Sequence, residues 1–202
     1  MNVFRKLLPA EWDRYKAHLL RLDRADRHLR FAGTVSDAVI ERHCQGLDWR
    51  NTIVIGWFDN GELRGASELR TAGTPFPKRA ELAFSVESAY QGRGIGHDLM
   101  SRALTIARNR GIKTIDVVCM LENRRMRSLA RKFTKAAVIE SGEVGVTIAL
   151  TMPNHVTLFL EALEDGAGVM SAVLGGFKAG VTHVLHTARL PGLPAGLVDA
   201  AP

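Results

Sequence analysis

The stretch VESAYQGRGIGHDLM, residues 86–100, decides the fold of this chain. It places Gly92, Gly94 and Gly96 between a run typical of a strand and a run typical of a helix. The first turn of a helix presents unpaired N–H groups and a partial positive charge, and glycines there let an anion reach the backbone. The sequence therefore predicts an anion site, best suited to phosphate, where this helix begins.

Three glycine patterns bind phosphate in this way, and their spacing separates them. The phosphate loop of nucleoside triphosphatases requires Lys-Ser or Lys-Thr after its glycines, and no such pair follows here. The dinucleotide fingerprint G-x-G-x-x-G requires glycine where this chain has His97, because Gly96 comes one position early. The third pattern, [RQ]-x-x-G-x-[GA] between a strand and a helix, is matched by Gln91, Gly94 and Gly96.

Hydrophobic periodicity around this motif predicts a mixed, layered sheet in which strands and helices alternate. We expect strands at 2–8, in a hairpin over 51–70, at 80–87, at 112–120 and in a hairpin over 137–151. We expect helices at 9–31, 34–47, 95–110 and 122–138, and a loop kept out of any central strand by its prolines at 74–79. In the strand at 80–87, Leu82, Phe84 and Val86 share one face, opposite Glu81 and Ser85.

Composition is that of a soluble globular protein, with 46% apolar and 24% charged residues in 202. No apolar stretch approaches the roughly 20 residues of a membrane-spanning helix. The chain opens without a recognisable signal peptide, so we expect a cytoplasmic protein with no membrane partner. Cys44 and Cys119 predict no disulfide framework, and no histidine has partners at metal-ligand spacing, so we expect no metal.

The positive charge is concentrated between Arg108 and Lys135, where nine basic residues face two acidic ones. Such a window is either the solvated face of a helix or a local field for a phosphate-bearing ligand. Aromatic residues are not interleaved with the basic ones as in nucleic-acid platforms, so we expect no nucleic-acid partner.

On these residues the chain resembles the GNAT superfamily of acetyl-CoA-dependent N-acetyltransferases. The Gln91-x-x-Gly94-x-Gly96 motif, the order of elements and Asn123 at the start of the second basic helix carry the resemblance. The segments AELAFSV…QGRGIG and DRADRHLRF are similar to the bacterial branch that acetylates protein lysines. The resemblance implies the GNAT acyltransferase fold, in the α/β (α+β) class. Its mixed central sheet is flanked by helices and splays at the acetyl-CoA site.

The resemblance also implies a division of the chain and a set of site residues. Residues 1–151 would form the acetyltransferase domain, and 152–202 a helical extension with an irregular tail. Backbone of the strand would bind the pantetheine arm, backbone of the glycine loop the pyrophosphate, and Asn123 the pantetheine near the thioester. Arg93, Arg127 or Arg131 would meet the phosphates. The full set of expected acetyl-CoA contacts is Phe84, Ser85, Val86, Gln91, Gly92, Arg93, Gly94, Ile95, Gly96, His97, Asn123 and Arg127.

The chemistry needs a base, since freeing a lysine-like amine at pH 7 costs roughly 4–5 kcal/mol. Glu81 is the expected base, because the resembled enzymes use a glutamate at this place, and Glu87 ranks second. A backbone N–H in the splayed strand would stabilise negative charge on the thioester carbonyl. The tyrosine that protonates the departing thiolate in many relatives is replaced by Ala130. Cys119 ends the adjoining strand, and we interpret it as a buried structural thiol.

These inferences predict an N-acetyltransferase that acts on a primary amine, either a protein lysine or a small amine, by direct transfer from acetyl-CoA. The alternative is a CoA-binding regulatory module with weak or no catalysis, and a basic nucleic-acid-binding protein is a third possibility. Two apolar stripes beyond residue 152 require cover from the same chain or a second subunit, so we expect a homodimer. The stripes are Val156, Phe159, Leu160 and Leu163, then Met170, Val173, Leu174 and Phe177.

Overall fold

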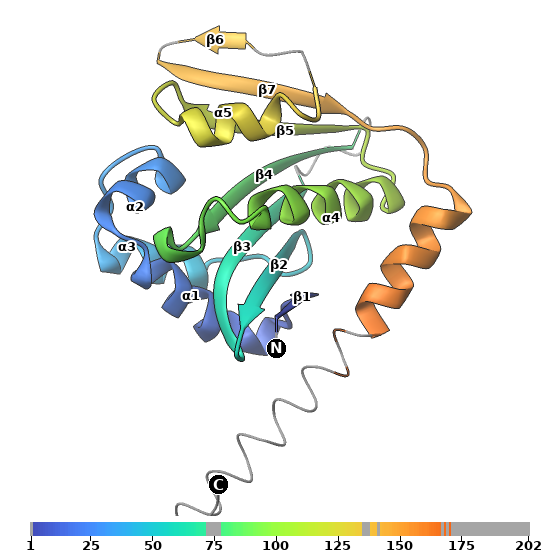
Figure 1. Cartoon of the computed structure of the whole chain (residues 1–202), viewed down its shortest axis with the longest axis horizontal. Coiled ribbons are helices and arrows are strands. Elements are labelled where there is room, and N and C mark those ends of the chain that lie inside the picture. The colour runs from blue at the N-terminus through green and yellow to red at the C-terminus, as the bar shows by residue number, and fades with distance from the viewer. Residues whose placement is uncertain are drawn as a thin grey trace, which may run out of the picture.

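The structure is a computed structural model that describes residues 2–71, 78–134, 138–140, 142–166, 168 and 170 (Figure 1). Its strands are β1 (Val3–Lys6), β2 (Thr52–Asp59), β3 (Glu62–Thr71), β4 (Arg79–Val86), β5 (Thr114–Met120), β6 (Val138–Glu140) and β7 (Glu143–Ala149). They form one sheet in the order β1-β2-β3-β4-β5-β7-β6. Every neighbouring pair is antiparallel except β4 and β5, which run parallel. The mixed sheet predicted from the sequence is confirmed.

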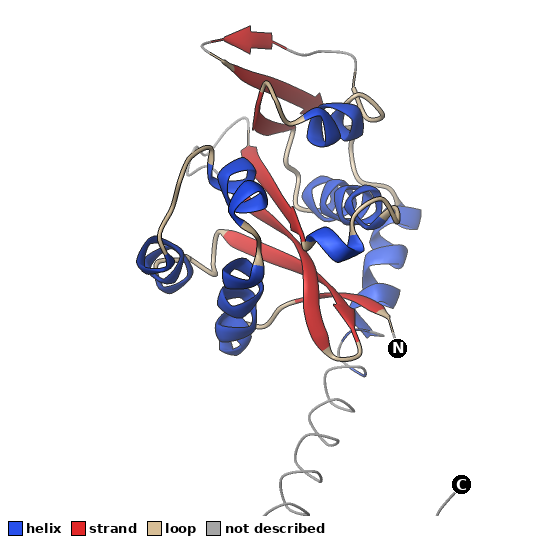
Figure 2. Ribbon diagram, turned by 60° about the vertical axis from the view of Figure 1, so that its left-hand side comes forward, coloured by secondary structure: helices blue, strands red, loops and turns tan. Residues whose placement is uncertain are grey.

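Helices cover both faces of this twisted sheet (Figure 2). They are α1 (Trp12–Arg21), α2 (Arg24–Phe31), α3 (Asp37–Gln45), α4 (Ile95–Asn109) and α5 (Arg124–Ala130), with short 3-10 turns η1 (Pro9–Glu11) and η2 (Ser88–Tyr90). A further helix covers residues 155–166. Two hydrophobic cores follow from this layering: one gathers around the apolar stripe of α4, and the other lies beneath α1 and α3.

The apolar stripe predicted for α4 is buried as expected. Its residues Leu99, Ala103 and Ala107 have no exposed surface and pack on strand residues such as Leu82 and Ile115. The β2–β3 hairpin is also confirmed. Its turn places Asn60 and Gly61 at φ 49° and 83°, the left-handed pair that a two-residue hairpin turn of this type requires.

The single helix predicted over residues 9–31 is wrong. The chain forms η1, α1 and α2 there, with a break after Arg21. Leu22 is extended at φ −60° and ψ 137°, and the carboxylate of Asp23 accepts a hydrogen bond from the Asp26 N–H at 2.8 Å. Aspartate satisfies free N–H groups best at a helix start, so Asp23 begins a new helix rather than continuing the old one. Apolar spacing alone did not reveal this cap.

The helix predicted over 122–138 is also shorter than expected. It ends at Ala130, and the next N–H groups, of Lys132 and Phe133, bond to carbonyls three residues back, as in a tightening turn. The hairpin of β6 and β7 then begins at Val138. Residues 135–137, the central part of the proline loop (74–77), positions 173, 174 and 177 of the second apolar stripe, and the tail 187–202 lie outside the described residues.

No helix in the described part of the chain is long and apolar enough to cross a membrane. The helix over 155–166 instead rests against the edge of the domain near β1 and the end of α4 (Figure 1).

Candidate functional site: a pocket between β4, β5 and the start of α4

The central feature of the site is a separation of two parallel strands. β4 pairs with β5 only from Arg79 to Glu81, opposite Thr114 to Asp116. Beyond that point β4 continues to Val86 bonded to β3, while β5 continues to Met120 bonded to β7. The edge of β4 after Glu81 therefore has no ladder partner among the described residues. Apart from the Val86 carbonyl, which accepts a hydrogen bond from Gln91, its backbone groups can meet a ligand.

A pocket of about 600 Å³ lies in this separation. It is lined by residues of α2, the end of β4, the glycine loop, α5 and the first turn of α4. In Figure 1 the other elements lie around the N-terminal end of α4. Its lining includes ten of the twelve expected acetyl-CoA contacts: Phe84, Ser85, Val86, Gln91, Gly92, Gly94, Ile95, Gly96, His97 and Asn123. Segments separated in sequence are thus brought to one cavity.

The glycine loop presents bare backbone to this pocket. Gly92 and Gly94 have φ of 74° and 84°, and a Cβ built on either would meet no atom within 4 Å. Gly94 is the N-cap of α4, whose fifteen residues give it a full helix dipole. Open space in front of free N–H groups at a helix start fits a pyrophosphate.

The basic residues at the pocket differ from those expected. Arg124, Arg125 and Lys132 line it, whereas Arg93 and Arg127 do not. Arg93 stacks on the ring of Tyr90 at 5.3 Å and donates to the Ala89 carbonyl at 2.8 Å, and Arg127 donates to the Leu121 carbonyl at 2.9 Å. The charged window in the sequence left open either a solvated helix face or a field for a phosphate-bearing ligand, and the tertiary structure decides which of its residues line the pocket.

Gln91 and Asn123 hold the pocket together. The Gln91 Nε2 donates to the Val86 carbonyl and to the Asp26 carboxylate, both at 2.8 Å, and its Oε1 accepts from Arg125. Gln91 thereby ties the glycine loop to β4, α2 and α5. Asn123 is the N-cap of α5, and its side-chain oxygen accepts from the Met126 N–H at 3.0 Å, which leaves its NH₂ group for a ligand.

Glu81 is the last residue of β4 that pairs with β5, and it lies outside the pocket lining. Its side chain is 61% exposed and accepts a hydrogen bond of 2.6 Å from Arg70 on β3. The second-ranked acid, Glu87, is buried, and its carboxylate accepts hydrogen bonds from Arg21 and Arg64, each at 2.9 Å. Burial opposes ionisation of Glu87, but hydrogen bonds from His18 and Arg21 outweigh it and lower the pKa of the carboxyl.

A buried ionic cluster that the sequence did not predict adjoins the pocket. The Glu68 carboxylate on β3 accepts from Tyr15 at 2.7 Å, Arg30 at 2.7 Å and His43 at 2.9 Å. Burial opposes the charge, but the hydrogen bonds of His43 and Tyr15 and the charge of Arg30 prevail, and the pKa of Glu68 falls to about 2. Arg30 also lines the pocket, so the cluster fixes one of its walls.

Other candidate residues lie away from the pocket. Cys119 is 5% exposed within the α4 core, where burial raises the pKa of its thiol. Ala130 is also buried in that core. Within the described ranges, no group of three or more His, Cys, Asp or Glu side chains is arranged to hold a metal ion.

The fold and the pocket define a class of protein. A seven-stranded mixed sheet that opens beside a glycine-rich helix start suits a ligand with a pyrophosphate and a long, amide-containing arm. Residues 11–134 match the model of the acetyltransferase (GNAT) family, so the chain belongs to that family, and the resemblance seen in the sequence is confirmed. It is an N-acetyltransferase, and enzymes of this family take acetyl-CoA as their acetyl donor.

Comparisons with individual proteins agree with this assignment. The chain is 28% identical over 131 residues to an acetyltransferase of Pseudomonas aeruginosa, covering 63% of this chain and 70% of that protein. Its fold is similar to the GNAT domain of S. lividans PAT, with a TM-score of 0.63, 22% identity and coverage of 73% and 89% of the two chains. It is also similar to a ribosomal-protein-alanine N-acetyltransferase of Brucella melitensis, with a TM-score of 0.56, 16% identity and coverage of 73% and 99%.

Proposed function

We propose that this enzyme transfers acetyl from acetyl-CoA directly to a primary amine, with Glu81 as general base. The acceptor is a protein lysine or a small amine. The observation that carries the proposal is the junction of the free β4 edge with the bare helix start, since one extended acyl-CoA can span both. A cytoplasmic location belongs to the same proposal. Cys44 and Cys119 are free and buried, as suits a reducing compartment.

In this proposal the glycine loop binds the pyrophosphate, and Arg124, Arg125 and Lys132 supply charge around it. Backbone from Phe84 to Val86 binds the pantetheine arm, and the Asn123 NH₂ group contacts the arm near the thioester. Residues 1–151 form the catalytic unit, and 152–202 an extension of it. Two observations support this arrangement: these pocket residues line one cavity, and the β4–β5 ladder ends at Glu81, just before the stretch assigned to the pantetheine arm.

Replacement of Glu81 by glutamine is expected to lower kcat/KM by at least about a hundredfold, because a positioned base contributes at this scale. Acetyl-CoA affinity should not change, since Glu81 lies outside the pocket lining. Glu62→Gln is the matched control: Glu62 is 60% exposed and paired with Arg64, as Glu81 is 61% exposed and paired with Arg70. Equal rates for the two variants would remove Glu81 as base.

The acceptor is identified by thiol release from acetyl-CoA with lysine peptides, polyamines, aminoglycosides and free amino acids. Release with one class names the acceptor. The second candidate function, a CoA-binding module without robust catalysis, is favoured by Ala130, a buried residue where many relatives carry a tyrosine that protonates the thiolate. Tight acetyl-CoA binding with no release from any amine would support the module instead.

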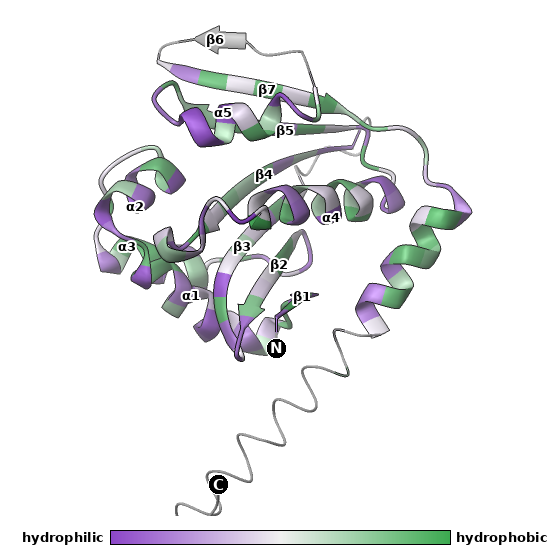
Figure 3. Cartoon of the chain, in the orientation of Figure 1, coloured by the Kyte–Doolittle hydropathy of each residue, from purple (hydrophilic) through white to green (hydrophobic). Residues whose placement is uncertain are grey.

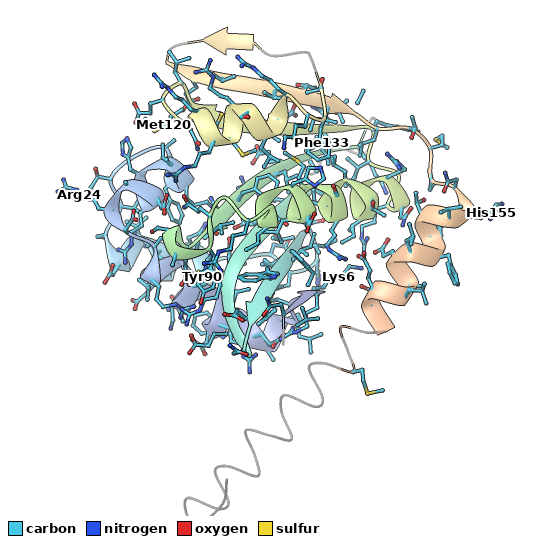
Figure 4. All side chains as sticks on the ribbon, viewed as in Figure 1. Lys6, Arg24, Tyr90, Met120, Phe133 and His155 are labelled. Atoms are coloured by element: carbon cyan, nitrogen blue, oxygen red, sulfur yellow. The ribbon has the colours of Figure 1, made fainter. Side chains whose placement is uncertain are left out.

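We also propose that the chain forms a homodimer through the outer face of the helix over 155–166. The inner face of this helix is bound to its own domain by polar contacts: Lys6 donates to Glu161 at 2.5 Å and to Asp165 at 2.7 Å, and Arg110 donates to Glu161 at 2.8 Å. Arg102 pairs with Glu164. Figure 4 shows Lys6 directed to this region from β1.

The outer face is apolar, and much of the ribbon of this helix is green, the hydrophobic colour, in Figure 3. Val156 and Phe159 are each 63% exposed, and Leu160 and Leu163 about half exposed. The three acidic residues of the helix are engaged on the inner side, so the outer face carries no carboxylate to repel an identical face. A second copy related by twofold symmetry covers such a face with its own equivalent.

Phe159→Glu is expected to convert the dimer to a monomer, because it buries an unpaired charge at the centre of the interface. Val118→Glu is the control, since Val118 is equally exposed at 60% but lies on β5. Sedimentation equilibrium would find twice the 22.2 kDa chain mass for the natural chain and for Val118→Glu, and one chain mass for Phe159→Glu. A monomeric natural chain would refute the dimer.

A further inference from the structure

Three buried side chains from two distant segments of the chain, α1 and the end of β4, form a row that ends at the pocket. The Nε2 of His18 on α1 lies 2.9 Å from the Ser85 Oγ on β4, and its Nδ1 lies 3.1 Å from the Glu87 Oε1. His18 is fully buried, and Ser85 and Glu87 are 7% and 8% exposed. Ser85 lines the pocket on the segment of β4 that has left β5.

The proton positions in this row follow from its chemistry. An ionised carboxylate only accepts hydrogen bonds, so Glu87 fixes a proton on Nδ1 of His18. The Nε2 then carries a lone pair and accepts from the Ser85 hydroxyl. Arg21 and Arg64 each donate a hydrogen bond of 2.9 Å to the Glu87 carboxylate and fix its position. The imidazole of His18 is therefore oriented by Glu87 at Nδ1 and by Ser85 at Nε2.

The surroundings of His18 favour its neutral form. Burial is the largest influence and lowers the pKa of His18, the positive charges of Arg21 and Arg30 act in the same direction, and Glu87 opposes them. A neutral imidazole behind a serine hydroxyl can take a proton and return it.

The other hydroxyl groups of the pocket lack this arrangement. Tyr90 lines the pocket, but its hydroxyl donates to Asp59 at 3.3 Å, outside the lining. Ser128 is exposed on α5. Among the pocket-lining hydroxyls described here, only the Ser85 hydroxyl bonds to a histidine.

We propose that Ser85 and His18 relay a proton from the attacking amine to the departing thiolate of CoA. This inference rests on the proposed acetyl transfer. Glu81 first takes a proton from the substrate ammonium and releases it to solvent, and attack by the freed lone pair on the thioester carbon forms the N–C bond. The tetrahedral intermediate then gives an N–H proton to the Ser85 oxygen as Ser85 passes its own proton to Nε2 of His18. As the C–S bond breaks, the proton returns by the same route to sulfur, so no outside acid is consumed.

Ser85 is the catalytic residue in this step because it touches the reacting atoms, and His18 is a positioning residue that acts through it. The relay gives the enzyme a proton source for the thiolate although Ala130 offers none. It also requires neutral His18. Activity should therefore fall as the pH drops through the pKa of His18, where the imidazole becomes charged.

The test compares Ser85→Ala with Ser85→Thr, which restores a hydroxyl on the same strand. Ser85→Ala is expected to lower kcat about ten- to a hundredfold with the KM for acetyl-CoA unchanged, and to lose the acid limb of the pH profile that depends on His18. Ser85→Thr should recover most of kcat and that limb. His18→Asn serves as a further variant, and thermal unfolding reports whether each variant folds.

Each outcome decides the matter. Full kcat and an unchanged pH profile in folded Ser85→Ala would overturn the relay while leaving acetyl transfer by the natural chain intact. A threonine variant as slow as the alanine variant, with both bound to acetyl-CoA, would reduce the row to a packing role and also overturn it. A natural chain that binds acetyl-CoA but acetylates no amine would remove the proposed function, and the relay with it.

Discussion

Replacement of Glu68 by alanine is expected to lower the free energy of unfolding by about 3–5 kcal/mol. The Glu68 carboxylate is 6% exposed and is the shared acceptor for Tyr15, Arg30 and His43. Its removal leaves the guanidinium of Arg30, itself 9% exposed, buried without its counter-charge. Unfolding of the natural chain and of Glu68→Ala in urea or guanidinium chloride measures the difference in their free energies of unfolding.

Glu81→Ala provides the control for this loss. Glu81 occupies the same face of the sheet on the neighbouring strand, but its ion pair with Arg70 is more than half exposed on both sides. Exposed ion pairs contribute about 0–1 kcal/mol to stability. Glu81→Ala should therefore unfold at almost the same denaturant concentration as the natural chain. Similar losses in both variants would contradict the assignment of a special role to the buried cluster.

The same cluster predicts a dependence of stability on pH. The folded pKa of Glu68 is about 2, below its ordinary value of 4.5. A carboxyl with a depressed folded pKa stabilises the fold above the unfolded value, and the contribution is lost as pH falls toward the folded one. On the order of 3 kcal/mol should therefore disappear between about pH 5 and pH 2. Glu68→Gln should flatten this part of the stability curve, and an unchanged curve would contradict the prediction.

Replacement of Gly94 by aspartate is expected to weaken acetyl-CoA binding about a hundredfold, or about 2.7 kcal/mol. Gly94 is the N-cap of α4 with φ 84°, and its Cβ would enter open space. Aspartate tolerates that conformation better than most residues and is a good N-cap, so the fold should survive. Its carboxylate would, however, enter the proposed pyrophosphate site and repel the ligand.

Gly61→Asp is the matched control for this variant. Gly61 has φ 83° in the β2–β3 turn, and a Cβ there also meets no atom within 4 Å. Both variants carry the same backbone strain and the same added charge, but only Gly94 lines the pocket. Calorimetric titration with acetyl-CoA should separate them. Equal affinities would show that the glycine loop is not the pyrophosphate site.

Local patterns predicted much of the fold and of the pocket beside the start of α4. Alternation in 80–87 gave β4, the stripe from Ile95 gave α4, and the glycine spacing located the helix start that opens on the pocket. These features depend on residues a few positions apart, where periodicity and capping act directly. The same local view failed at Asp23, because a cap competes with apolar spacing and the spacing does not record it.

The sequence by itself determined the family, the glycine loop at the start of α4 and the existence of an apolar stripe at 156–163. Only the tertiary structure decided which arginines reach the pocket, which side of the C-terminal helix faces outward, and which side chains meet. His18 and Ser85 are 67 positions apart, and Tyr15 and Glu68 are 53 apart. Contacts of this range form when whole elements dock. The docking is set by the summed burial of two cores, so no short pattern encodes which polar groups it brings together.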